Sequence, residues 1–114
     1  VFFPSHWGMP YKVLKSQSIL EIGKSGSNIS RECNNLFGMK HPIKRDTMSS
    51  GTCRGHAKYV SIFASIYDRF LWDKYNGIKW NGKKLDYIGQ VVRQRYNPNP
   101  VGYAAAWVDI ISQN

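Results

Sequence analysis

The chain has 114 residues and a mass of 13.1 kDa, enough for one folded domain with one core and one cleft. Its 42% hydrophobic and 20% charged residues are typical of a globular protein and exclude a disordered tail. Sixteen Lys and Arg against seven Asp and Glu give a net charge of +9, which favours polyanions such as nucleic acid, acidic membranes or anionic cell-wall polymers. No zinc-finger, RRM or basic-helix motif accompanies the charge, so no nucleic-acid partner is expected. No apolar run approaches 18 residues, so no transmembrane segment is predicted.

Apolar periodicity and helix-end residues predict helices over residues 9–23, 27–34, 61–75, 83–95 and 101–112. Between the second and third helices, residues 38–59 are rich in Gly, Ser, Thr and Pro, and we expect a loop with at most a short hairpin. The last two helices have apolar faces expected in the core, formed by Leu85, Ile88, Val91 and Val92 and by Tyr103, Trp107, Val108 and Ile111. The predicted class is mainly α (α+β), a single domain over residues 1–114.

Glu21 lies on the face of the first helix that should be buried. At 100° per residue the predicted solvent side carries Lys12, Ser16 and Gly23, and the opposite side carries Val13, Leu14, Gln17, Leu20 and Glu21. An unpaired carboxylate there is costly, so either a basic residue of another helix pairs with it or apolar neighbours raise its pKa. The second case keeps a proton on Glu21 near neutral pH, as a general acid for glycoside cleavage requires. Gln17, one turn earlier, could hydrogen-bond the carboxyl or a sugar.

The other acidic residues offer one further candidate. Asp68, Asp73, Asp86 and Asp109 lie in predicted helices beside basic residues, and we expect them on solvated helix faces. Asp46, in the KRDT stretch of the loop, is placed where a second catalytic carboxylate could sit, and a turn residue is the alternative.

The cysteines and histidines give no metal motif. Cys33 and Cys53 are 20 residues apart and could form one disulfide or remain two buried thiols. His6, His41 and His56 lie far apart and lack ligand spacing, so no metal and no cofactor is expected.

The stretch Ser16–Lys40 closely resembles the glucosaminidase family of bacterial cell-wall hydrolases, which includes the flagellar peptidoglycan hydrolase domain, autolysins and phage lysins. That family reads roughly A-Q-x-x-x-E-S-G-x-G-x-S, then N-L-F-G-I-K. The residues in register are Gln17, Glu21, Gly23, Ser27, Asn35, Leu36, Phe37, Gly38, Met39 and Lys40. Further stretches, Y-x-S-x-x-x-S-I-x-D and Y-A-T-D-P-x-Y-A, match Tyr59, Ser61, Ser65, Ile66, Asp68, Tyr96, Pro100, Tyr103 and Ala104.

This resemblance implies a lysozyme-like fold whose cleft lies between a helical lobe and a small loop or β lobe. It implies that Glu21 is the general acid, that Tyr96 lines the cleft beside it, and that the turn 35–38, beginning at Asn35, shapes the floor. Tyr59, Tyr96 and Phe37 are candidates for contacts with sugar faces, and a core role is the alternative for Phe37. Peptidoglycan glycan strands are the implied substrate.

The chain also departs from the family pattern. Ile22 replaces the Ser after the catalytic Glu, Lys24-Ser25 replaces Trp-Gly, and Pro98-Asn99 replaces Thr-Asp. Residues 41–59, the predicted loop or β lobe, contain no Glu that could act as a second carboxylate. The reaction at the sugar face opposite Glu21 is therefore assigned to the substrate's 2-acetamido group or to a water oriented by Asp46 or Tyr96.

The activity predicted is that of an endo-β-N-acetylglucosaminidase acting on peptidoglycan. The alternatives are a muramidase or lytic transglycosylase of the same fold, and a non-catalytic wall-binding or virion module. The resemblance implies a secreted or periplasmic wall enzyme or a phage lysin, possibly within a larger wall or tail assembly.

Overall fold

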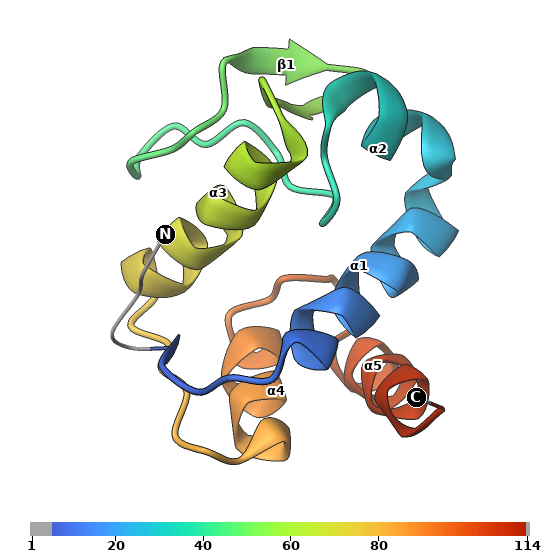
Figure 1. Cartoon of the computed structure of the whole chain (residues 1–114), viewed down its shortest axis with the longest axis vertical. Coiled ribbons are helices and arrows are strands. Elements are labelled where there is room, and N and C mark those ends of the chain that lie inside the picture. Colours follow the sequence, from blue (N-terminus) through green and yellow to red (C-terminus); the bar gives the residue numbers. More distant parts are fainter. Residues whose placement is uncertain (1–5, 114) are drawn as a thin grey trace.

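The computed structural model describes residues 6–113, and this part of the chain is mainly helical with one small sheet. Its elements are α1 (Tyr11–Ser25), α2 (Ser27–Cys33), β1 (Gly51–Cys53), β2 (His56–Lys58), α3 (Ile62–Tyr75), α4 (Lys84–Arg93) and α5 (Pro100–Ser112). Figure 1 shows α2 and the hairpin at one end of the molecule and α4 and α5 at the other, with α1 and α3 running between them. The predicted α+β, lysozyme-like class is confirmed. No helix within residues 6–113 is long and apolar enough to cross a membrane.

The helix boundaries follow from local chemistry. Gly26 has a φ of 81°, a left-handed value that glycine adopts without steric cost, and it separates α1 from α2. Ser27 is the first residue of α2, and Gly26 holds its N-cap position. The Ser61 and Asn99 side chains cap α3 and α5 by accepting from the backbone N–H of Ala64 and Gly102, each at 3.1 Å.

The main core lies where α1 and α4 pack against α5. Trp107 is fully buried, and its indole N–H donates to the Val13 carbonyl oxygen at 2.9 Å, which ties α5 to α1. Tyr103 and Ile111 are buried on the same face, as predicted. Helix α5 therefore presents its Tyr103 hydroxyl toward residues of α1, the element that carries Glu21.

The buried face of α4 differs from the predicted one. Ile88 and Val91 are buried, but Leu85 is 62% exposed. Tyr87 takes its place in the core because its ring packs against Trp107 and its hydroxyl donates to Asp73. At 100° per residue, Leu85 then points about 120° away from Val91. The prediction for Leu85 is wrong because a polar contact sets the rotation of the helix.

Three residues assigned to solvated faces are buried instead. Ser16 is buried with its hydroxyl donating to the Lys12 carbonyl oxygen of its own helix at 2.7 Å, so burial leaves no hydroxyl unpaired. Asp68 and Asp73 on α3 are fully buried, because each carboxylate receives an Arg guanidinium and further donors. Asp86 and Asp109 are exposed, as predicted.

Asp68 ties the long loop before β1 to α3. Its carboxylate accepts two hydrogen bonds from Arg45 at 3.0 Å, one from the Thr47 hydroxyl at 2.8 Å, one from the Met48 backbone N–H at 2.9 Å and one from the Tyr59 hydroxyl at 2.5 Å. Burial alone would raise the pKa of Asp68, but these donors outweigh it and lower the pKa. The loop is thereby held in one conformation without regular secondary structure.

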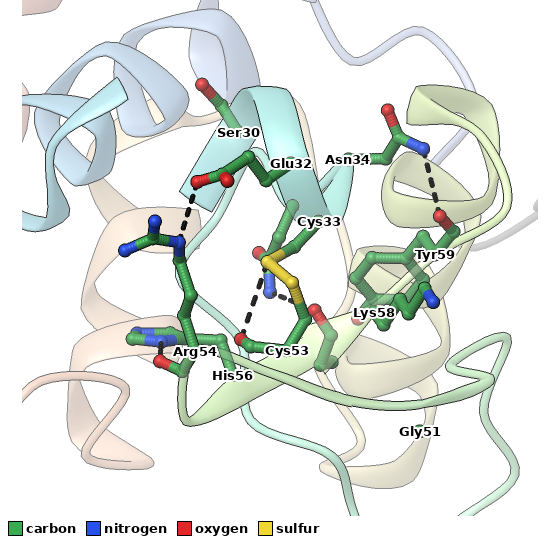
Figure 2. The surroundings of a disulfide bond; sticks show 12 residues. Ser30, Glu32, Cys33, Asn34, Gly51, Cys53, Arg54, His56, Lys58 and Tyr59 are labelled. Atoms are coloured by element: carbon green, nitrogen blue, oxygen red, sulfur yellow. Dashed lines mark hydrogen bonds and ion pairs between the residues drawn. A yellow bond between two sulfur atoms is a disulfide. The ribbon is translucent and has the colours of Figure 1, made fainter. Parts of the chain in front are cut away.

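The hairpin is covalently joined to α2. Cys33 at the end of α2 and Cys53 in β1 form a disulfide, which decides between the two states left open by the sequence. Figure 2 shows the bridge between the helix and the hairpin, with the Arg54–Glu32 ion pair (2.6 Å) at the surface beside it. On the other side, the Asn34 amide donates to the Tyr59 carbonyl oxygen at 2.9 Å. The small lobe (residues 38–59) is therefore attached to α2 through several links.

Candidate active site

Glu21 lies in the last turns of α1 and is 8% exposed, so its carboxyl is nearly buried but not sealed from solvent. Tyr103 of α5 donates its hydroxyl hydrogen to Glu21 Oε2. Within residues 6–113, no Lys or Arg forms an ion pair with this carboxyl. The structure therefore does not have the compensating ion pair that the sequence allowed.

Burial raises the pKa of Glu21. The Tyr103 hydrogen bond and the charges of Lys24, His56 and Arg69 act in the opposite direction, and the net pKa remains raised. A carboxyl with a raised pKa keeps its proton to higher pH and can transfer it to a leaving group. This is the electrostatic state expected for a general acid.

Gln17 is fully buried one turn before Glu21 and contacts neither the carboxyl nor the surface. Its amide N–H donates to the Tyr103 oxygen at 3.1 Å, and its carbonyl oxygen accepts from Arg69 Nε at 2.9 Å. The two contacts proposed for it, with the Glu21 carboxyl or with a sugar, are replaced by an indirect one through Tyr103.

Asn35 organises the turn after α2. Its Nδ2 donates to the carbonyl oxygens of Met39 and Ala57, both at 2.9 Å, and its Oδ1 accepts from the backbone N–H groups of Met39 (3.1 Å) and Phe37 (3.3 Å). One buried amide thus closes the turn and attaches it to β2. This geometry suits a residue that shapes the floor of a cleft.

Two residues proposed to contact sugar faces lie in the interior. Phe37 and Tyr59 are each 2% exposed, Phe37 in the main core and Tyr59 in a small cluster with Ala57 and Ala64. Stacking on a sugar needs an exposed ring face, so in this conformation neither ring is available to a sugar. For Phe37, the structure matches the core alternative.

Tyr96 lies at the edge of a pocket. Its ring meets Trp72 edge-on at 4.8 Å, its hydroxyl donates to the Phe37 carbonyl oxygen at 2.8 Å, and its ring centre is 6.1 Å from that of Tyr103. The pocket has a volume of about 570 Å³ and is lined by residues 38–45, Trp72, Tyr75, Asn76 and residues 94–96. Glu21 is not among the lining residues, and its link to the pocket runs through Tyr103, which contacts both Glu21 and Tyr96.

The pocket combines aromatic rings with cationic groups. Trp72, Tyr75 and Tyr96 supply the rings, and Lys44 and Arg95 supply exposed charges. Aromatic surface suits the apolar face of a sugar ring, and the cations suit a carboxylate attached to it. The pocket is therefore suited to an acidic sugar or a short branch of one.

Asp46 lies on the exposed part of the loop and does not line the pocket. The neighbouring Arg45 donates to the Asp46 carbonyl oxygen at 2.9 Å and directs its guanidinium to Asp68. Across the described chain there is no group of three or more His, Cys, Asp and Glu side chains that could hold a metal ion.

The sequence did not identify Tyr103, Arg69 and Asp73 as parts of the hydrogen-bonded surroundings of Glu21 and Gln17. Tyr103 lay in the late matching segment but was assigned only to the core. Arg69 and Asp73 are four residues apart on α3, a spacing that indicates an ion pair but not its burial. The signal for Tyr103 is a Tyr on an otherwise apolar helix face, because a buried hydroxyl there needs a hydrogen-bond partner.

The lysozyme-like fold and the nearly buried Glu21 carboxyl with a raised pKa are features expected of a small α+β glycosidase. The comparison with known families agrees: the family model Glucosaminidase, described as mannosyl-glycoprotein endo-beta-N-acetylglucosaminidase, matches residues 5–114. The chain therefore belongs to the glucosaminidase family of glycoside hydrolases, and its substrate is a glycan. No curated protein and no solved structure matches the chain.

Proposed function

We propose that this protein is an endo-β-N-acetylglucosaminidase that cleaves the glycan strands of bacterial peptidoglycan, with Glu21 as the general acid. The observation that carries the proposal is the Glu21 carboxyl, 8% exposed and with a pKa raised by burial. The net charge of +9 and the cations of the adjacent pocket favour an anionic glycan, and peptidoglycan carries carboxylates on its lactyl peptides. The motif resemblance to wall hydrolases points to the same substrate.

In the proposed reaction, the Glu21 proton passes to the glycosidic oxygen while the bond from C1 to that oxygen breaks and C1 gains oxocarbenium character. The two other buried carboxylates, Asp68 and Asp73, are bound to Arg45 and Arg69 and are not free to act at C1. The substrate's own 2-acetamido oxygen then forms the bond to C1. Water opens this ring, giving its proton to the Glu21 carboxylate and its hydroxyl to C1.

The Cys33–Cys53 disulfide supports a place outside the reducing cytoplasm, because such bonds persist in oxidising compartments. We accordingly propose that the protein acts at the cell wall, either as a secreted or periplasmic enzyme or as a phage lysin or virion component.

The test compares Glu21→Gln with wild type on purified sacculi. The amide keeps the shape but has no acidic proton, so we expect at least about a 10²-fold loss of turnover with an unchanged circular dichroism spectrum. Glu32→Gln is the matched control, because Glu32 is the other glutamate of the chain and its side chain is 51% exposed. Near-wild-type turnover by the Glu21 variant would contradict the assignment.

Mass spectrometry of the released muropeptides identifies the bond. Reducing N-acetylglucosamine ends are expected. Reducing N-acetylmuramic ends would instead indicate a muramidase, and 1,6-anhydromuramic ends a lytic transglycosylase. Pelleting with sacculi without any release of fragments would indicate a non-catalytic wall-binding module.

A further inference from the structure

A continuous chain of buried hydrogen bonds runs from α3 to the Glu21 carboxyl. Arg69 donates from Nη1 to Asp73 Oδ1 at 2.5 Å and from Nε to Gln17 Oε1 at 2.9 Å. Gln17 Nε2 donates to the Tyr103 hydroxyl oxygen at 3.1 Å, and Tyr103 donates to Glu21 Oε2. Four residues of this hydrogen-bond network are at most 2% exposed, namely Asp73, Arg69, Gln17 and Tyr103. Water therefore does not compete for these contacts.

The direction of these hydrogen bonds is set from the Arg69 end. A guanidinium group can only donate, so the Gln17 oxygen must face Arg69 and its NH₂ group must face Tyr103. The Tyr103 oxygen therefore accepts from Gln17, and its own hydrogen is left for Glu21. Burial, together with Tyr96 and Glu21, raises the pKa of Tyr103, so the hydroxyl keeps that hydrogen.

Resting on the proposed function, we propose that Arg69, Gln17 and Tyr103 are positioning residues that direct the catalytic proton of Glu21 to Oε1. The oxygen that accepts from Tyr103 must be the better acceptor of the carboxyl, and in a carboxylic acid that is the carbonyl-type oxygen. Oε2 therefore takes the carbonyl role, and the acidic hydrogen lies on Oε1, the oxygen left for the substrate.

Several further contacts surround Arg69, the donor end of the hydrogen-bond network. The Arg69 guanidinium lies 5.1 Å from the ring centres of both Trp72 and Tyr96. Its partner Asp73 also accepts from the His6 ring at 2.6 Å and from the Tyr87 hydroxyl. Burial alone would raise the pKa of Asp73, but the Arg69 charge and these donors lower it, so the carboxylate stays ionised.

The same hydrogen bond from Tyr103 limits how far the pKa of Glu21 rises. The other groups that act on this carboxyl are Lys24 on its own helix, His56 in β2, Arg69 in α3 and Tyr96 before α5. None of these is altered when the Tyr103 hydroxyl alone is removed. The Tyr103→Phe variant therefore isolates the contribution of the network to the titration of Glu21.

The experiment is a ¹³C-carboxyl NMR titration of protein labelled at glutamate. The chain has two glutamates, so Glu32 serves as an internal reference for Glu21. Tyr103→Phe should move the Glu21 midpoint to higher pH, because burial remains and the donor is gone. The upper limb of the pH–rate profile should move with it, and kcat should fall about tenfold while KM stays, since Tyr103 touches no substrate.

Two substitutions at Gln17 test the direction of the chain. Gln17→Glu offers an acceptor to Tyr103, diverts its hydrogen and should raise the Glu21 midpoint. Gln17→Met fills the same space with only a weak thioether acceptor, so Tyr103 still donates to the stronger Glu21 acceptor and the midpoint should stay. In the Tyr103→Phe background, the shift caused by Gln17→Glu should shrink to the effect of its charge, because no hydroxyl remains to be diverted.

An unmoved Glu21 midpoint in folded Tyr103→Phe would overturn the proposal. Equal shifts in Gln17→Glu and Gln17→Met, or full additivity with Tyr103→Phe, would overturn the assigned direction. Because the titration needs no substrate, a shifted midpoint in an inactive protein would retain the network and reject the proposed function. If the Gln17 variants do not fold, the comparison of Tyr103→Phe with wild type still tests whether Tyr103 sets the midpoint of Glu21.

Discussion

Glu21, Asp68 and Asp73 are all buried carboxyl groups, yet their surroundings favour opposite charge states. Asp68 and Asp73 each receive an Arg guanidinium and a Tyr hydroxyl, and these donors lower the pKa of both despite burial. Glu21 receives one Tyr hydroxyl and no ion pair within the described residues, so burial dominates and its pKa is raised. A guanidinium in contact therefore distinguishes the two carboxylates with a lowered pKa from Glu21, the carboxyl with a raised pKa.

The Asp46→Asn variant tests whether a second carboxylate takes part in the proposed cleavage. Asp46 lies on an exposed loop outside the pocket, so we expect turnover within about threefold of wild type. A thiazoline inhibitor that mimics the 2-acetamido intermediate should then bind. A loss on the order of 10²–10⁴-fold, measured on sacculi with the fold intact, would instead assign Asp46 as the base that orients water.

Among the elements, the hairpin and the loop before it have little core of their own. Ala57 and Tyr59 are buried there, and the rest of the attachment comes from the Cys33–Cys53 bridge and the bonds that Asp68 makes to the loop. Short strands of three residues cannot be stable alone in water. The small lobe is therefore held by its links to α2 and α3.

Removal of the bridge should destabilise the protein. For a 20-residue separation, loop-closure entropy predicts about 3 kcal/mol, and the melting temperature of a Cys33→Ala/Cys53→Ala variant should fall by on the order of 10 °C. A reducing agent should lower the melting temperature of wild type by a similar amount and leave the double variant unchanged. An unaffected wild type under reduction would show that the bridge contributes little.

For the whole molecule, the buried carboxyl groups make opposite contributions to the pH dependence of stability. The lowered pKa values of Asp68 and Asp73 give stability that is present above about pH 4, the unfolded value, and is lost as pH falls through their folded pKa. The raised pKa of Glu21 has the opposite effect on the free energy of unfolding. It does not lower stability below about pH 4, and it lowers stability as pH rises through its folded pKa.

Glu21→Gln should therefore be more stable than wild type at neutral pH, and the difference should disappear toward pH 4. The acid side of the profile, due to Asp68 and Asp73, should remain in the variant. Urea unfolding at a series of pH values measures both effects through the free energy of unfolding. A constant difference between the two proteins at all pH values would mean that Glu21 titrates as it does in the unfolded chain.

The sequence by itself determined the features that depend on neighbours along the chain. Helix positions follow from 3.6-residue periodicity and from helix-end residues such as Ser61, and the same periodicity placed Glu21 on the buried face of α1. The positions of the loop and short hairpin followed from the Gly- and Ser-rich composition between Gly38 and Tyr59.

Only the tertiary structure decided where the polar side chains go. Tyr103 reaches Glu21 across 82 residues, Arg69 reaches Gln17 across 52, and Arg45 reaches Asp68 across 23. Helical periodicity shows on which face of a helix a residue lies, but not which group of another element contacts it. For this reason the sequence predicted Asp68 and Asp73 to be solvated acids beside basic neighbours. Their burial becomes favourable only when distant donors converge on them, and that convergence depends on how the helices pack.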